Sequence, residues 1–401
     1  MNQKTVLISG ASIAGPTLAY WLTRFGFQTT IVERADSLRL GGQNVDISGI
    51  AQKIVQRMGI ESDILAANTG ELGVRFVDEN DVTKAELPKG ESNIGTRELE
   101  ILRGDLAEIL YKHTKDTVEY LFGDQIAQLN DQESGVIVTF QTGTERRFDL
   151  VICADGIRSK TRSLIFGDEP TVRPLGLYMA YFTVPRTITD SAWARWYNAP
   201  GSRVVFIRPD NEGTTRASLS FLSEPKGYER LPLAEQKEIL KTTFADVGWE
   251  APRLLAELDA NQDIYFDGIS QVRAPRWSTG RCAMVGDSAF CPSPLSGMGT
   301  SLAIVGAYVL AGELAGNANY KQAFTEYERR LRPFVDKVQK LPPGVPWVAH
   351  PKTQLGISVF NAGIRLLSSR FVKRIADLFS KKGANASPDD IVLPDYWKGT
   401  V

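Results

Sequence analysis

Residues 5–15 read Thr5-Val6-Leu7-Ile8-Ser9-Gly10-Ala11-Ser12-Ile13-Ala14-Gly15. The first five residues form a short apolar run that is typical of a buried strand, and the glycines that follow predict a tight turn. Apolar residues at helical spacing then lead to Gly26, and a second β-prone run, residues 28–32, ends at Glu33. This order of strand, glycine turn, helix, strand and acid predicts a βαβ unit of the dinucleotide-binding kind.

The chemistry of this turn follows from its backbone. Gly10 permits the tight turn, and Gly15 lets the helix pack close to the strand. The N–H groups of the helix start suit a pyrophosphate, and the Glu33 carboxylate can accept hydrogen bonds from a ribose, which favours FAD or NAD over NADP on this unit. Ser12 replaces the middle glycine of the usual pattern, so its Cβ leaves less room beside a phosphate. An ordinary strand-to-helix loop is the alternative.

The composition is that of a globular protein. The chain has 401 residues, enough for two or three domains with substantial cores. Hydrophobic residues make up 43% and charged residues 23%, both ordinary values. The formal net charge is −1, so no overall field favours a nucleic acid or an anionic membrane.

Cysteines and histidines are few. The three cysteines (Cys153, Cys282 and Cys291) have neither metal-type spacing nor disulfide density, which fits a reducing cytoplasm. The N-terminus leads directly into a strand, so we expect no signal peptide, and we expect no apolar run as long as a membrane span. With only His113 and His350, we expect no Ser-His-Asp triad and no metal site. We infer that a cofactor carries the chemistry.

Residues 171–270 have a different pattern. β-prone runs occur at 177–184, 194–197, 202–208 and 215–222, and clusters of turn residues separate them. One helix is predicted near 233–247. The segment therefore predicts a mostly antiparallel sheet that forms a second domain.

Three further stretches could hold a cofactor. An amphipathic helix is predicted from Glu98 to Leu110, with Arg103 near its start, and a buried strand ends at Asp155-Gly156 before a basic helix start. A strand at 281–285 leads through Gly286-Asp287 and a Pro/Gly loop, 291–299, into an apolar helix at 300–314. Such a helix start can lie at the pyrimidine edge of a flavin and stabilise negative charge there. A solvated arginine and plain turns are the alternatives.

The C-terminal part is predicted to be helical, at 320–340 and, after Pro342-Pro343, at 355–382. The last helix has apolar residues at helical spacing, which are Val359, Phe360, Ile364, Leu367, Phe371, Ile375 and Phe379. Packing in a core or as a lid is the simplest interpretation. The basic cluster Lys373, Arg374, Lys381 and Lys382 leaves membrane contact open.

Taken in order, the glycine turn with Glu33, the Arg103 helix, Asp155-Gly156, and Gly286-Asp287 with its Pro/Gly loop resemble the class A flavoprotein monooxygenases. This aromatic-hydroxylase family has the p-hydroxybenzoate hydroxylase fold, and the likeness covers about residues 1–340. Within the family the chain is most similar to the tetracycline-inactivating monooxygenases. The stretches that carry this likeness are 41–47, 100–106 and 291–297.

The resemblance implies an α/β fold: a Rossmann-like FAD-binding domain (residues 1–170 and 271–340), an inserted, mostly antiparallel substrate domain (171–270) and a C-terminal helical region (341–401). It also implies the residues that hold FAD. These are Gly10, Ser12, Ala14, Gly15, Glu33, Arg34, Asp46, Arg103, Asp155, Gly286, Asp287, Pro294, Gly297, Met298 and Gly299. Arg39 could meet NADPH, which would share the Asp155-Gly156 segment because no second dinucleotide unit is visible.

The chain departs from the family pattern at two places. The run after Gly286-Asp287 is Ser288-Ala289-Phe290, where the family often has a histidine, and Ser301 stands where an asparagine is common. We expect these differences to affect the substrate or the flavin environment more than the presence of the flavin site.

The resemblance implies hydroxylation that uses NADPH and O2, through a C4a-hydroperoxyflavin, with no catalytic side chain required. The substrate would be polycyclic or phenolic, most specifically a tetracycline, and the protein a cytoplasmic monomer. Loose matches in the β-rich segment suggest contacts with substrate from Tyr181, Arg195, Phe206 and Arg216, although each could be an ordinary sheet residue. Within the same class, the alternative is a hydroxylase of a phenol, a quinolone precursor or a polyketide. From another class, the alternative is a flavin- or nucleotide-binding sensor, or a prenyl-lipid-binding protein that resembles a reductase and has no oxygenase activity.

Overall fold

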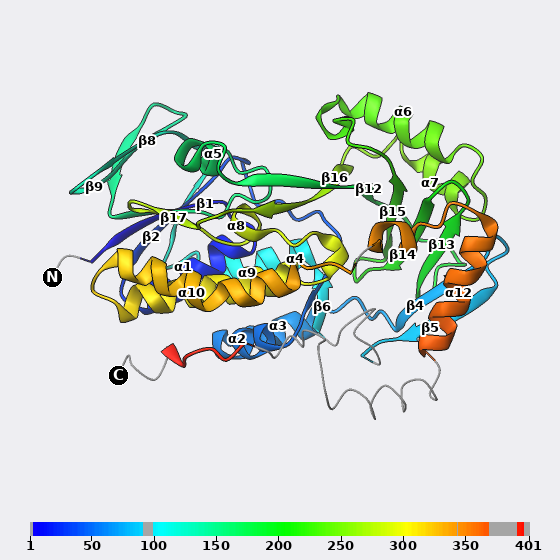
Figure 1. Ribbon diagram of the computed structural model, residues 1–401, viewed down its shortest axis with the longest axis horizontal. Helices are drawn as coiled ribbons and strands as arrows, with labels where there is room; N and C mark the ends of the chain where they lie inside the picture. Colours follow the sequence, from blue (N-terminus) through cyan, green and yellow to red (C-terminus); the bar gives the residue numbers. More distant parts are fainter. Residues whose placement is uncertain (1–2, 91–98, 343, 369–390, 397–401) are drawn as a thin grey trace.

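The chain folds around two β-sheets at opposite ends of an elongated molecule (Figure 1). The computed structural model describes residues 3–90, 99–342, 344–368 and 391–396. Helices cover both sheets, which agrees with the mixed α/β class expected from the sequence.

The first sheet has the βαβ unit at its centre. Its strand order is β17-β18-β11-β1-β2-β7, and every neighbouring pair is parallel except β17 with β18. The strands are β1 Thr5–Ser9, β2 Gln28–Glu33, β7 Glu119–Phe122, β11 Leu150–Cys153, β17 Ser278–Thr279 and β18 Cys282–Met284. Three distant parts of the chain therefore bring the carboxyl ends of β1, β11 and β18 to one edge, where open α/β sheets bind their ligands.

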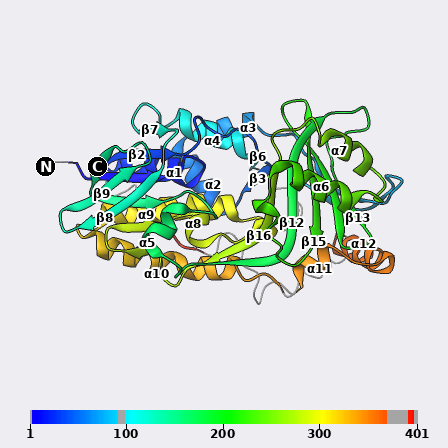
Figure 2. The same cartoon turned by 90° about the horizontal axis from the view of Figure 1, so that it is seen from above.

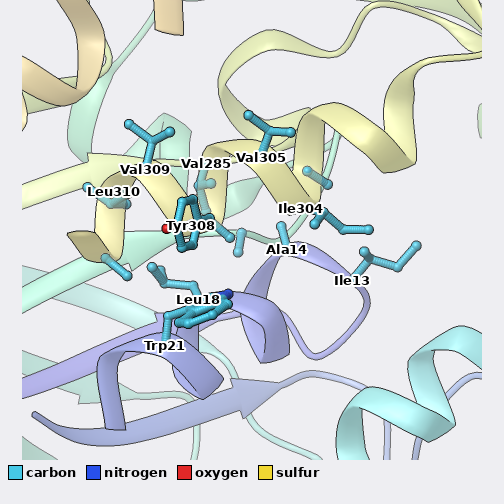
Figure 3. Packing of buried hydrophobic residues seen from close by; sticks show 14 of the residues in the cluster. Ile13, Ala14, Leu18, Trp21, Val285, Ile304, Val305, Tyr308, Val309 and Leu310 are labelled. Atoms are coloured by element: carbon cyan, nitrogen blue, oxygen red, sulfur yellow. The ribbon is translucent and has the colours of Figure 1, made fainter. Parts of the chain in front are cut away.

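Helices α1 (Ala14–Arg24) and α9 (Gly299–Gly316) pack together on one face of this sheet (Figure 3). The rings of Trp21 and Tyr308 meet edge to face with centroids 4.9 Å apart. By length and composition α9 could cross a membrane, so the expectation that no apolar run is that long is wrong. However, 78% of α9 is buried, as in the core helix of a folded domain. Helix α10 (Tyr320–Val338) covers α9, and its Tyr327 hydroxyl donates to the Met284 carbonyl.

The opposite face of the first sheet is covered by a small antiparallel sheet of order β10-β9-β8. Its strands are β8 Ile126–Gln132, β9 Gly135–Phe140 and β10 Glu145–Phe148. Val136, Val138 and Phe140 pack against Leu7 and Val151. Helix α5 (Lys160–Phe166) lies beside this layer.

The second sheet has seven strands in the order β16-β12-β15-β14-β13-β4-β5. They are β12 Thr171–Pro185, β13 Ala194–Ala199, β14 Arg203–Pro209, β15 Thr214–Leu222, β16 Tyr265–Arg273, β4 Gly73–Val77 and β5 Thr83–Pro88. All neighbours are antiparallel except β13 with β4. The sheet thus extends beyond the segment 171–270, because β4 and β5 join its edge from an earlier part of the chain.

Helices α6 (Leu233–Phe244) and α7 (Ala251–Glu257) cover one face of the second sheet (Figure 2). Alternate residues of the strands, such as Ala180, Val205 and Leu219, enter this core. The residues between them, such as Phe206, therefore lie on the other face.

The prediction of a helix from Glu98 is wrong at its start. Leu99–Leu102 is a strand, β6, which pairs antiparallel with β3 (Asn44–Ile47), and the helix α4 begins only at Arg103 and ends at Lys112. All four residues of β6 are buried, so its apolar residues do not mark one face of a helix. Helices α2 (Ile50–Met58) and α3 (Glu61–Ala66) complete this region.

The C-terminal segment packs on the second sheet. Helices α11 (Val345–Ala349) and α12 (Gln354–Ser368) follow the Pro342-Pro343 break. On α12, Phe360 and Ile364 pack on an aromatic row of the sheet formed by Phe76, Trp196 and Phe206. Phe371, Ile375, Phe379 and the basic cluster 373–382 lie outside the described residues.

A buried histidine joins α11 to the sheet. His350 is 2% exposed, and its Nδ1 lies 3.0 Å from the Pro346 carbonyl oxygen. Because a carbonyl only accepts, Nδ1 carries the proton, and Nε2 accepts from the Ser220 hydroxyl at 2.8 Å. The Asn198 amide adds a bond to the Ala349 carbonyl at 2.8 Å. Burial lowers the pKa of His350 to about 4.

We predict that His350 makes the stability of the protein pH-dependent. Its pKa is lower in the folded protein than in the unfolded chain, so the folded state gains protons less readily. The contribution is complete above about pH 6.5 and is lost as the pH falls towards 4, by about 3 kcal/mol in total. Urea unfolding at pH 7, 5.5 and 4 should show this loss in the wild type and a smaller one in His350→Gln.

The matched control is His113→Gln, since His113 is the other histidine and lies at the surface beside Asp63. Its pH dependence should stay close to that of the wild type. Equal slopes for His350→Gln and the wild type would contradict the prediction.

Candidate functional site

The glycine turn at the end of β1 leaves no room for side chains. Gly10 has φ +110°, and a Cβ there would lie 2.5 Å from the Ala154 carbonyl oxygen. A Cβ on Gly15 would overlap the carbonyl oxygen of Gly10. Both glycines are therefore required by close backbone approach, and the N–H groups at the start of α1 are left accessible to a phosphate.

Ser12, the departure from the glycine pattern, has a partner. Its hydroxyl accepts a hydrogen bond from Nη1 of Arg103 at 3.1 Å. Arg103 also donates to the carbonyls of Gly41 and, at 3.4 Å, Arg39. The side chain in place of the middle glycine thus holds the arginine at the turn.

Arg103 carries a charge that its neighbours do not neutralise. Across the described ranges of the chain, its guanidinium has no carboxylate within 4 Å, and its hydrogen bonds go to neutral oxygens. Burial lowers the pKa of Arg103, and the nearby charge of Arg39 lowers it further. An anion such as a diphosphate would relieve this repulsion, and the turn lies next to it.

Glu33 ties the second strand to the turn. Its two carboxylate oxygens accept from the N–H groups of Ala11 at 3.0 Å and Ala35 at 3.1 Å. Each oxygen keeps acceptor capacity, so the carboxylate can also bind the hydroxyls of a ribose. Arg34 and Arg39, which follow it, are exposed.

The Gly286-Asp287 segment meets the same turn. Gly286 has φ +66°, and a Cβ there would lie 2.9 Å from the Cβ of Ala14. Asp287 begins the short helix α8 (Asp287–Phe290), and its side chain is reached by solvent. The protein that surrounds the carboxyl still desolvates it, which raises its pKa. An accessible but crowded carboxyl indicates a concave site.

The Pro/Gly loop closes this site. It contains the 3-10 turn η2 (Pro294–Ser296) and Gly297 with φ +63°, and it leads through Met298 and Gly299 into α9. The Ser48 hydroxyl lies 3.4 Å from the sulfur of Met298, and the Ser48 N–H donates to the Ser301 hydroxyl at 3.0 Å. The end of β3, which carries Asp46, is thereby held against the start of α9.

The Asp155 carboxylate forms hydrogen bonds with neighbouring groups of its own segment. It accepts from the Ser159 hydroxyl and from the Thr161 N–H, so it caps the start of α5. These bonds fix the turn that Gly10 packs against.

A cavity of about 670 Å³ lies beyond this turn, between α5, β8 and β16. Arg158, Lys160, Arg162 and Arg230 line it, against two carboxylates, Glu229 and Asp267. Arg158 pairs with Asp267 at 2.5 Å. The lining is therefore net positive and suits an anionic ligand.

Three of the four suggested substrate residues share one face of the second sheet. Tyr181 on β12, Phe206 on β14 and Arg216 on β15 alternate with residues of the helix-covered core, so they point away from it. Arg216 is held by Asp210 at 3.0 Å and by the Thr183 hydroxyl at 2.7 Å.

The structure does not bring Arg195 together with these three. It is 4% exposed and lies on the helix-covered face, paired with Asp190 and Asp81 at 2.8 Å and with Glu250 at 3.3 Å. Its direct neighbour in register is Ile207 rather than Phe206. A position one residue along a strand points to the opposite face, which spacing alone did not reveal.

Arg208, which was not among the predicted site residues, lies two residues after Phe206 on the same face of the sheet. Its Nε and Nη2 donate to the two carboxylate oxygens of Glu71 at 2.7 and 3.0 Å, and it lies 3.7 Å from Glu100 on β6. This cluster joins the second sheet to β6. The alternation of Phe206 and Arg208 was the available signal, but the partners come from distant segments.

Comparisons with known proteins agree with this geometry. The family model described as an FAD binding domain matches residues 3–341. A flavin-dependent monooxygenase of Legionella longbeachae is 42% identical over 86% of this chain and 88% of its own length. The flavin-dependent monooxygenase eupH of a Phoma species is 36% identical over 99% of both chains. The solved structure of the tetracycline destructase Tet(55) is 34% identical, with a TM-score of 0.81 over 98% of this chain and 99% of that one.

We predict that Gly15→Ala removes the bound flavin. The added methyl group would overlap the Gly10 carbonyl, so the turn must open and its N–H groups must move. Flavin content per protein, measured by absorbance after purification, should fall at least tenfold.

Gly248→Ala is the matched control, because a Cβ there meets no atom within 4 Å and no positive φ is involved. It should keep the wild-type flavin content. Full flavin content in Gly15→Ala would show that the turn does not bind the cofactor.

We predict that Arg195→Leu acts on stability rather than on substrate binding. It leaves Asp190 and Glu250 buried with one fewer cation, so the free energy of unfolding should fall by about 3 kcal/mol, while KM of the folded fraction should change little. Arg75→Leu on the neighbouring strand is the control, since its half-exposed pair with Glu86 is worth at most about 1 kcal/mol. A selective rise in KM for Arg195→Leu would reverse this assignment.

Proposed function

Since the chain belongs to the class A FAD-dependent monooxygenases, we propose that it hydroxylates a polycyclic or phenolic substrate, most specifically a tetracycline, with NADPH and O2. The observation that carries the proposal is the convergence of Gly10, Gly15, Gly286 and Arg103 at one edge of the first sheet. Because these glycines carry no side chains, a phosphate can approach the backbone of the turn. The Arg103 guanidinium, whose charge is not neutralised by a carboxylate, lies beside it.

The protein supplies binding and positioning. Bound FAD supplies the redox chemistry, taking electrons from NADPH and activating O2 for transfer of one oxygen atom. The start of α1 and Arg103 would hold the diphosphate, and Glu33 the ribose. The Pro/Gly loop and β3 would frame the ring system and exclude water from it.

The proposal for the substrate rests on similarity and on the second sheet. Tet(55), which covers nearly the whole chain, is described as a tetracycline destructase. Phe360 and Ile364 of α12 cover the aromatic row around Phe76. On the same face of the sheet, Tyr181 lies near Arg208, whose guanidinium lies over the Phe206 ring, so aromatic groups beside a cation would suit a fused-ring substrate with polar oxygens. Another aromatic or polyketide substrate is the alternative, and it fits the same surface.

NADPH is proposed as the donor on grounds of charge. The basic cavity lined by Arg158, Lys160, Arg162 and Arg230 adjoins the turn after Asp155-Gly156, and Arg39 is exposed near Arg103. Several cations in reach of one turn suit the three phosphate groups of NADPH.

We predict that the purified protein has flavin absorbance and that tetracycline stimulates its NADPH oxidation at least several-fold, with loss of the drug's own absorbance. Oxygen consumption measured in parallel separates hydroxylation from release of hydrogen peroxide. Bound flavin with tetracycline untouched would retain the monooxygenase and discard this substrate, and a panel of phenols and polyketides would then replace it.

A further inference from the structure

The Pro/Gly loop contains one residue with an unfavourable backbone conformation. Ser293, just before the turn η2, has φ +77° and ψ 156°. This region of backbone space suits glycine, because the Cβ of any other residue is crowded there. Pro294, which follows, restricts Ser293 to extended conformations, in which φ is normally negative. A strained residue of this kind persists only where the surrounding structure holds it in place.

The side chain of Ser293 gives nothing in return for this strain. It is 2% exposed, and its hydroxyl is buried without a hydrogen-bond partner among the described residues. A buried hydroxyl without a partner is itself destabilising. The shape of the loop must therefore be imposed by the hydrogen bonds of its backbone.

Two buried glutamines hold the backbone on the N-terminal side of Ser293. Gln271 and Gln339 are each 3% exposed. Nε2 of Gln271 donates to the Pro292 carbonyl at 3.0 Å, and Nε2 of Gln339 donates to the Cys291 carbonyl at 3.1 Å. The two carbonyls directly before the strained residue are thereby fixed by a glutamine clamp, formed by Gln271 and Gln339.

The members of the glutamine clamp also hold each other. Nε2 of Gln271 donates to the Gln339 carbonyl at 2.9 Å, and Nε2 of Gln339 donates to the Val272 carbonyl at 2.8 Å. Since a carbonyl only accepts, each amide must turn its nitrogen towards these groups, which settles the orientation of both side chains. The Val272 N–H adds a bond to the Cys291 carbonyl at 3.1 Å.

On the C-terminal side of Ser293 the loop binds only to itself in the contacts that the described residues make there. The Ser293 carbonyl accepts from the Ser296 N–H at 3.2 Å and from the Ser296 hydroxyl at 2.9 Å. That hydroxyl accepts from the Met298 N–H at 3.1 Å. These bonds can move with the loop, whereas the glutamine clamp ties the strained residue to other elements.

The glutamine clamp comes from two elements outside the loop. Gln271 lies on β16 of the second sheet, and the same strand carries Tyr265, whose ring centroid is 6.3 Å from that of Tyr181. Gln339 caps the C-terminal end of α10. The shape of the loop therefore depends on how the second sheet and α10 lie against it.

Both ends of the loop belong to the cofactor site. Gly286, before the loop, packs on Ala14, and Met298, at its end, contacts Ser48. Because Ser293 lies between these ends, relaxation of its backbone would shift the turn η2, which we expect beside the flavin.

We propose that Gln271 and Gln339 are positioning residues that hold the Pro/Gly loop in the shape that binds FAD, so that the affinity for FAD depends on the docking of the second sheet. This inference rests on the place beside the flavin that the proposed function gives to the loop. With serine at position 293 the loop needs the glutamine clamp, because without it the backbone relaxes to a negative φ. Glycine at this position would make the clamp unnecessary.

The first experiment titrates the flavin-free full-length protein with FAD and follows the quenching of flavin fluorescence. Gln271→Ala leaves the Pro292 carbonyl without its donor, so the dissociation constant should rise by about tenfold or more. Adding Ser293→Gly to Gln271→Ala should bring it back to within about threefold of the wild type, because the loop no longer has strain to release. Gln128→Ala, at an exposed glutamine of β8, is the control and should bind FAD as the wild type does.

Ser293→Ala is the matched control for the rescue, because it keeps the Cβ and removes only the hydroxyl. By itself it should keep the affinity of the wild type, and added to Gln271→Ala it should restore nothing. Rescue by both substitutions, or by neither, would overturn the proposal. A loss of affinity in Ser293→Ala alone would overturn it too, since the hydroxyl and not the strain would then matter.

The second experiment requires no clamp variant, so it decides the matter if Gln271→Ala does not fold. Urea unfolding of the flavin-free protein should give a higher midpoint for Ser293→Gly than for Ser293→Ala, because only glycine relieves the strain. A lower midpoint for Ser293→Gly would show that the backbone is not strained and would overturn the proposal.

The two proposals fail separately, because FAD binding is measured without NADPH or substrate. The expected pattern of FAD affinities in a protein that hydroxylates no substrate would contradict the proposed function alone. Hydroxylation by a protein whose FAD affinity is unchanged in Gln271→Ala would contradict the glutamine clamp alone.

Discussion

Close approach of backbones at one edge of the first sheet is the constraint on which the structure depends. Gly10 lies against Ala154, Gly15 against Gly10, and Gly286 against Ala14, in each case at a distance that excludes a Cβ. Strands from three separate parts of the chain can therefore end within contact of one another. This packing brings the N–H groups at the start of α1 close to the Arg103 guanidinium, so both could bind the same anionic ligand.

The second sheet is joined to this edge by polar contacts rather than by a shared core. The core beneath α6 and α7 is separate from the core around α9. Between them, Arg208 on β14 binds Glu71 and approaches Glu100 on β6. A buried ion cluster is a costly way to join two units, because its charges must be desolvated.

The sequence was informative where structure is local. The β-prone runs and the turn residues between them predicted β12–β15, and the glycine turn predicted β1, α1 and β2. It failed where distant segments decide. β4 and β5 join the second sheet only through pairing with β13, and β6 is a strand because β3 lies beside it. Arg195 and Arg208 show the same limit, since the sequence predicted their strands but not the face of the sheet on which each side chain lies. The role of Ser12 likewise depends on a distant residue, because its hydroxyl accepts a hydrogen bond from Arg103.

The order of the strands along the chain affects the rate of folding, because neighbours in both sheets come from distant parts of the sequence. The first sheet begins at β1 and is not complete until β18, while the second needs β4 and β5 from the early part of the chain, β13 from near its middle and β16 from beyond the middle. The pairing of β4 with β13, for example, joins Val74 to Ala194, which are far apart in the sequence. Such non-local contacts raise the contact order and slow folding, because loop entropy is lost before the contacts form. Each sheet contains strands from both halves of the chain. During synthesis, most of the chain must therefore leave the ribosome before either sheet can be completed.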